Sequence, residues 1–214
     1  MTNIPIVLPD TLQNRKNEFD LYLKKAIERI KSFAAEYSWE KHTEKSFMDK
    51  VMIFDSKPEF DKMLLGLCEM PLDTELPETY CGALEERVLA VVTPEIYSTV
   101  YPQGIENDFY TKILAHEIAH RLHICILEGD EEAMGPIWFF EGFALFAADQ
   151  FEHSGLTLTT EEIIDILKTE DRGSYEKYAY IFRSLVNKAD LKELVAKAGD
   201  SDFNQYIINR ISEQ

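Results

Sequence analysis

The sequence predicts an α+β fold in which a small β-sheet precedes a largely helical second half. Short β-branched or alternating apolar runs, typical of strands, are confined to residues 50–93, whereas residues 107–212 repeat apolar side chains at helical spacing. No internal repeat, low-complexity tract or Gly/Ser-rich linker is present. We therefore expect a single compact domain, 1–214, of two lobes, 1–128 and 129–214, with a cleft between them.

The first lobe is expected to combine one long helix with two strands. Residues 10–38 form an amphipathic helix that packs on the sheet, with shielding of the cleft as a pro-segment the alternative. Residues 50–55 indicate a short strand, after which Ser56 opens a capping box for a helix that ends near Cys68. Residues 80–93 predict the longest strand.

Helices are expected throughout the rest of the chain. The first spans residues 107–127 and is followed by Gly129, and the second surrounds Glu141. Thr159 caps a third helix, and three more are expected at 174–188, 190–199 and 202–212.

The segment His116-Glu117-Ile118-Ala119-His120 is the strongest functional signal in the chain. Two histidines four residues apart on a helix project from one face, at the spacing that lets both rings reach one zinc ion. Glu117 lies about 100° around the helix from His116, where it can act on a metal-bound water without binding the metal. A single oxygen ligand from a later helix would leave one coordination position open, as in catalytic zinc sites.

Glu141 is the candidate for that third ligand. Its neighbours in Trp138–Phe146 are apolar almost all round, so its carboxylate is expected to be buried and compensated by metal ligation rather than by a salt bridge. His123 also lies near the ligand face, but it is expected to be a supporting or surface residue. With His123 and Ile126 in place of Gly and His, the three-histidine zinc class is excluded.

Together these segments resemble the gluzincin metallopeptidases, in which two histidines and one glutamate bind zinc. The chain is most similar to the aminopeptidase N-like and small peptidase MA-like domains, whose W-x-x-E-G-x-A segment matches residues 138–144. The resemblance covers about residues 80–190. It implies a zincin-like fold, with Glu141 as the third ligand and Gly142 allowing its helix to pack closely on the helix of His116.

Two further roles follow from the resemblance. The segment that begins Ser174-Tyr175-Glu176-Lys177 is similar to a Y-E-K-G helix start, which implies that Tyr175 donates a hydrogen bond to the oxyanion of the reaction, with Tyr178 as the alternative. Gly82-Ala83-Leu84-Glu85-Glu86 is similar to a G-A-M-E-N strand, which implies that Glu85 holds the free amino terminus of a substrate. The alternative for Glu85 is a solvent-facing glutamate on an edge strand.

Composition limits the partners and the compartment. A net charge of −17 makes nucleic-acid binding unfavourable, and no signal peptide or membrane-spanning run is evident. The cysteines, Cys68, Cys81 and Cys125, are odd in number and have no metal-like spacing, which is typical of reduced thiols in a cytoplasmic protein. The sequence does not indicate an oligomeric state.

The sequence therefore predicts a zinc-dependent peptidase that acts on a peptide or protein substrate. Zn²⁺ would be held by His116, His120 and Glu141, with Glu117 as the general base and Tyr175 as the oxyanion donor. Two alternatives remain: an inactive zinc-binding pseudo-peptidase that serves as a scaffold or sensor, and an acidic helical interaction protein in which the motif is accidental.

Overall fold

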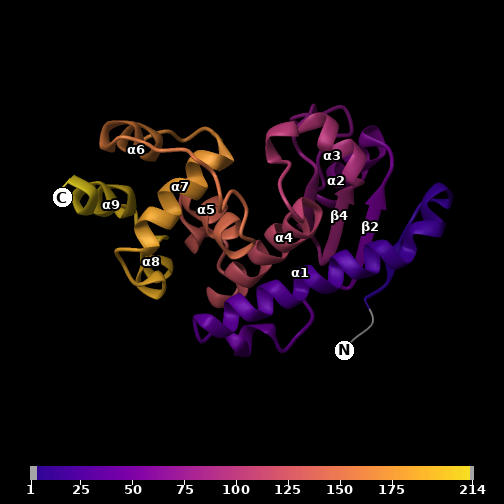
Figure 1. Ribbon diagram of the computed structural model, residues 1–214, viewed down its shortest axis with the longest axis horizontal. Coiled ribbons are helices and arrows are strands. Elements are labelled where there is room, and N and C mark those ends of the chain that lie inside the picture. Colours follow the sequence, from indigo (N-terminus) through magenta and orange to yellow (C-terminus); the bar gives the residue numbers. More distant parts are fainter. Residues whose placement is uncertain (1–3, 213–214) are drawn as a thin grey trace.

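The computed structural model describes residues 4–212 and shows an α+β fold, as predicted (Figure 1). Residues 1–3 and 213–214, at the two ends of the predicted domain, lie outside the described residues. A four-stranded mixed sheet has the strand order β1-β2-β4-β3. Its strands are β1 (Ile6–Val7), β2 (Lys50–Phe54), β3 (Gly82–Glu85) and β4 (Val88–Val92).

The sheet is parallel except at one edge. Strand β2 pairs in parallel with β1 and β4, whereas β3 pairs antiparallel with β4 and forms the outer edge. Every residue of β4 is buried, as expected for a central strand rich in valine. Helix α2 (Lys57–Leu67) follows β2 and begins at Ser56, whose hydroxyl accepts a hydrogen bond from the amide of Glu59 at 3.4 Å.

The prediction of one long strand over residues 80–93 was wrong, because this segment is a hairpin. Glu86 and Arg87 form the turn between β3 and β4, both with positive φ. Such a turn favours Asn-Gly or Asp-Gly, so the sequence carries no local signal for it. Contacts outside the hairpin hold it, since the guanidinium of Arg87 donates to the carboxylate of Asp49 at 2.8 and 3.0 Å and to the carbonyl oxygen of Ser46 at 3.0 Å.

The predicted N-terminal helix divides into η1 (Asp10–Arg15) and α1 (Lys16–Glu36). Helix α1 packs mainly along α4 (Phe109–Ile126), rather than on the sheet as expected. Aromatic contacts join the two helices, with the rings of Tyr22 and Tyr110 5.1 Å apart. The following turn, η2 (Glu40–Thr43), also contacts α4. The N-terminal segment therefore supports the helix that carries the two candidate histidines.

Helices form the second half of the chain, as predicted. Helix α5 (Ile137–Ala147) packs between α4 and α7 (Tyr175–Val186). In Figure 1 the sheet lies on one side of α4 and α5, and the C-terminal helices lie on the other. The remaining elements are α3 (Pro94–Val100), η3 (Pro102–Gly104), η4 (Glu132–Met134), α6 (Thr160–Leu167), α8 (Leu191–Lys197) and α9 (Phe203–Ser212).

Two further properties concern the cysteines and the helices. Cys68, Cys81 and Cys125 are all free thiols. Across residues 4–212, none of the helices has the length and apolar character needed to cross a bilayer.

Candidate metal centre

Helix α4 carries two of the three candidate ligands, and its first turn is fixed to the sheet. The buried Tyr110 hydroxyl donates a hydrogen bond to the carbonyl oxygen of Val92 in β4 at 2.9 Å. Further along the helix, His116 and His120 project together, and their Nε2 atoms lie 3.0 Å apart. His116 is 5% exposed, so its ring lies inside the protein.

Helix α5 brings the third candidate ligand to the histidines. Glu141 is 2% exposed, and its Oε2 atom lies 3.1 Å from Nε2 of His116 and 3.6 Å from Nε2 of His120. Burial disfavours the carboxylate form of Glu141. The hydrogen bonds and positive charges of the two imidazoles outweigh that effect and hold the pKa of Glu141 well below its ordinary value.

The donor atoms of His116, His120 and Glu141 are spaced so that one metal ion could bind all three. Tetrahedral zinc with bonds of about 2.0–2.1 Å separates its ligand atoms by about 3.3 Å. The three observed separations, 3.0, 3.1 and 3.6 Å, lie on both sides of that value. These three residues are therefore close enough to hold a metal ion.

Gly142 has a different neighbour from the one expected. A Cβ atom at this position would lie 2.8 Å from Cδ2 of Phe182 in α7, closer than atoms of this kind approach. Gly142 therefore permits close packing of α5 on α7, not on α4 as the resemblance implied. This contact holds the helix of Glu141 against α7, the helix that begins at Tyr175.

Arg172, in the loop before α7, is a site residue that the sequence did not reveal. Its Nη1 atom donates hydrogen bonds to Oε1 of Glu141 and, at 2.7 Å, to the hydroxyl of Tyr175. Glu141 thus has the salt bridge that was not expected for it, although through only one carboxylate oxygen. Arg172 and Glu141 are 31 positions apart in the sequence. A single arginine in a polar loop belongs to no sequence motif or periodic repeat that would predict this contact.

Glu117 lies beside the cluster and beneath the edge strand. A Cβ atom at Gly82 in β3 would lie 3.0 Å from Oε1 of Glu117, so this glycine leaves space for the carboxylate. Desolvation is the main cause that raises the pKa of Glu117 to about 7; the influence of His116 opposes this shift, and the charge of Glu141 supports it. The surroundings of Glu117 therefore increase the proton affinity of its carboxyl group.

Tyr175, the candidate oxyanion donor, also lies near the cluster. Its ring centroid is 5.8 Å from that of His116, and its hydroxyl accepts the hydrogen bond from Arg172. Burial, and then the charge of Glu141, raise the pKa of Tyr175 well above its ordinary value, so the hydroxyl keeps its proton. Tyr178 has another role, because its hydroxyl accepts from the amide of Gly173 at 2.5 Å and supports the loop.

Glu85 lies in β3, on the edge strand, and is exposed. Partial desolvation, followed by the charges of Glu131 and Glu86, raises the pKa of Glu85, while the charge of His120 lowers it. Glu85 does not belong to the group of potential metal ligands found among residues 4–212.

His123, the remaining histidine of α4, is fully buried. The expectation that it could lie at the surface was therefore wrong. The ring of His123 stacks on Phe143 with centroids 4.3 Å apart. Within the described part of the chain, neither of its nitrogens has a hydrogen-bond partner, nor does Nδ1 of His116. The acceptor that usually orients a metal-binding imidazole is therefore not supplied to His116 by these residues.

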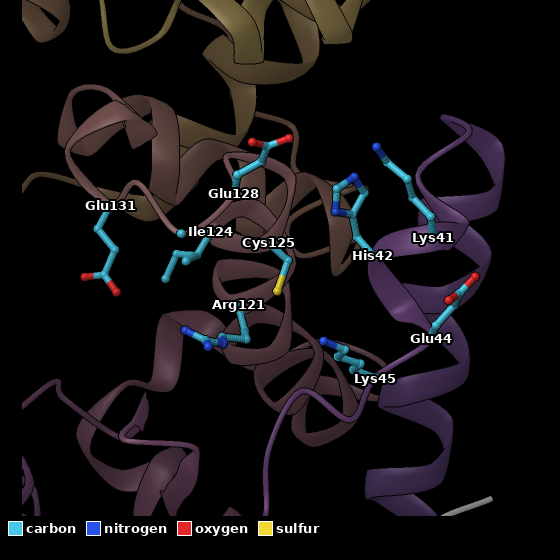
Figure 2. A pocket seen from close by; sticks show the side chains of 10 residues that line it. Lys41, His42, Glu44, Lys45, Arg121, Ile124, Cys125, Glu128 and Glu131 are labelled. Atoms are coloured by element: carbon cyan, nitrogen blue, oxygen red, sulfur yellow. The ribbon is translucent and has the colours of Figure 1, made fainter.

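A separate hollow of about 500 Å³ opens beside another part of α4. In Figure 2, Lys41 and Lys45 from the segment around η2 stand opposite Arg121 and Cys125. The described residues that line it include three Lys or Arg side chains and three carboxylates, and none of them belongs to the metal cluster. This balance of charge does not favour a ligand of either sign.

Comparisons with known proteins identify no relatives. No family model matches the chain, and neither the curated proteins nor the solved structures contain a significant match.

Proposed function

We propose that this protein is a zinc-dependent peptidase of the gluzincin type, with a zincin-like arrangement of its active site. The observation that carries the proposal is the convergence of His116, His120 and Glu141 next to the half-buried carboxyl group of Glu117. Zinc at such a site lowers the pKa of a bound water toward 7 and polarises a carbonyl group.

The edge strand supports a peptide as the substrate. Strand β3 ends the sheet order, and Gly82 in β3 lies directly over Glu117. An extended peptide that hydrogen-bonded to the outer edge of β3 would therefore pass beside this carboxylate. Glu85, at the far end of the same strand, would bind a positive group such as a free amino terminus.

The two remaining groups, Glu117 and Tyr175, would transfer a proton and stabilise a developing negative charge, respectively. Glu117 takes the proton of the attacking water and delivers it to the leaving amine, for which a pKa near the working pH is the favourable value. The Tyr175 hydroxyl, which keeps its proton, donates a hydrogen bond to the oxyanion that develops on the scissile carbonyl.

The test replaces Glu117 with Gln, which keeps the shape of the side chain and removes the base. We expect Glu117→Gln to bind zinc as the wild type does and to lose about 10²–10⁴-fold in peptide cleavage, measured on a peptide library by mass spectrometry. Glu36→Gln, at the exposed end of α1, is the control for loss of one negative charge. Full activity of Glu117→Gln would contradict the general-base role. Zinc binding by the wild type without cleavage of any peptide would favour the scaffold or sensor.

A further inference from the structure

Glu141 presents its two carboxylate oxygens to different partners. Oε2 faces the Nε2 atoms of His116 and His120 at 3.1 and 3.6 Å, whereas Oε1 accepts a hydrogen bond from Nη1 of Arg172. With 2% of its surface exposed, the Glu141 side chain has little room to rotate. The two oxygens are therefore held in different environments.

Several contacts fix Arg172 in place. Its guanidinium lies 5.4 Å from the ring centroid of Tyr80, just before β3, and 6.0 Å from that of Tyr175. The loop around Arg172 is held by Tyr178, whose buried hydroxyl binds the amide of Gly173. The arginine thus bridges the segment before the edge strand and the start of α7.

The hydrogen bonds of Arg172 differ from those of a simple ion pair. Arginine commonly binds a carboxylate with two parallel hydrogen bonds, one to each oxygen. Here both hydrogen bonds that Arg172 makes to described residues start from Nη1, one to Oε1 of Glu141 and one to the hydroxyl of Tyr175. The arrangement connects the candidate ligand to the candidate oxyanion donor and leaves Oε2 of Glu141 to the histidines.

We propose that Arg172 is a positioning residue that restricts Glu141 to metal ligation through Oε2 alone and aims the Tyr175 hydroxyl. This inference rests on the metal-binding part of the proposed function. A carboxylate that binds through one oxygen keeps a coordination position available for water or substrate, whereas a carboxylate that binds through both oxygens occupies it. Arg172 would therefore act on the reaction through Glu141 and Tyr175.

The test replaces Arg172 with Met, which keeps the length of the stem and removes the charge and the donors. Loaded with Co²⁺ in place of zinc, the wild type should show the strong visible absorption of a four-coordinate ion. In Arg172→Met we expect the weaker absorption of a five-coordinate ion, because Oε1 is free to bind. The variant should retain its metal, because loss of the arginine charge removes a repulsion on the bound cation. Its kcat for peptides should fall about 10–100-fold.

Arg210→Met is a matched control far along the sequence. Like Arg172, Arg210 pairs with a carboxylate (Glu193), donates to a tyrosine hydroxyl (Tyr206) and lies over that ring, and its side chain is 39% exposed against 37% for Arg172. We expect this variant to keep the cobalt spectrum and the kcat of the wild type. An unchanged spectrum in Arg172→Met would overturn the proposal. So would loss of metal from that variant, because Arg172 would then merely support the cluster.

A measurement on the wild type keeps the proposal testable if Arg172→Met does not fold. X-ray absorption of the zinc-loaded wild type should show one carboxylate oxygen at the metal, and two oxygens from Glu141 would overturn the inference. Failure of the wild type to bind zinc would instead refute the proposed function, so the two failures are distinguishable.

Discussion

His123 shows how burial changes the chemistry of one residue. The ring is fully buried, stacks on Phe143 and has neither nitrogen hydrogen-bonded within residues 4–212. Burial, and to a lesser extent the electrostatic influence of His120, lower the pKa of His123 to about 3. In the unfolded chain the same ring has a pKa of about 6.5. His123 is therefore neutral when folded, at pH values where the unfolded chain binds a proton.

We expect this difference to make the protein sensitive to acid. At pH 7 both states are neutral at His123, so its titration has no effect on stability there. Between about pH 6.5 and 3 the unfolded state binds the extra proton, so stability falls as the pH falls, by up to about 1.4 kcal/mol per pH unit.

His123→Leu, of similar volume, tests this expectation. Unfolding in urea should show the variant within about 1 kcal/mol of the wild type at pH 7, and increasingly more stable than the wild type as the pH is lowered to 4.5. Parallel pH profiles for the two proteins would show that His123 does not contribute to acid sensitivity.

At the residue scale, the spacing of His116 and His120 placed both rings at one point because four residues make about one helical turn. The position of Glu141 followed from its apolar neighbours and from the family resemblance. Arg172 was not predictable, because a long-range contact from a loop leaves no periodic pattern in the sequence. The orientation of Gly142 toward Phe182 was missed for a related reason, since both sides of α5 are apolar.

At the element scale, the helices were predicted better than the strands. The helical repeat of apolar residues predicted α4 and α5, and the capping box of Thr159 and Glu162 marks the start of α6 as expected. The hairpin of β3 and β4 was missed because long-range contacts stabilise its turn. Helix α3 was missed because the buried run of β4 continues directly into its cap, Thr93.

The hairpin turn offers a test at this scale. Glu86 has φ 46° and is exposed, a backbone conformation that asparagine adopts more easily than glutamate. We expect Glu86→Asn to raise the free energy of unfolding by about 0.5–1 kcal/mol, measured by urea denaturation. Glu86→Gln removes the same charge without relieving the turn and should show no such gain. Equal stability of both variants would contradict the conformational argument.

At the scale of the whole molecule, the fold brings together ligands from two helices. Helix α1 and the sheet support α4, and α7 supports α5, so His116, His120 and Glu141 meet only when both halves are folded. A metal that binds only the folded chain stabilises it by mass action, by about 2.7 kcal/mol when the free metal is at 100 times its dissociation constant. We therefore expect zinc to raise the unfolding temperature and a chelator to reverse that effect.

Zinc content after equilibrium dialysis, measured by elemental analysis, tests the metal centre most directly. The wild type is compared with a variant in which His116 and His120 are both replaced by Ala, and both proteins are first stripped with a chelator. We expect stoichiometric zinc in the wild type and none above background in the variant. Equal zinc content in the two proteins, or none in the wild type, would contradict it.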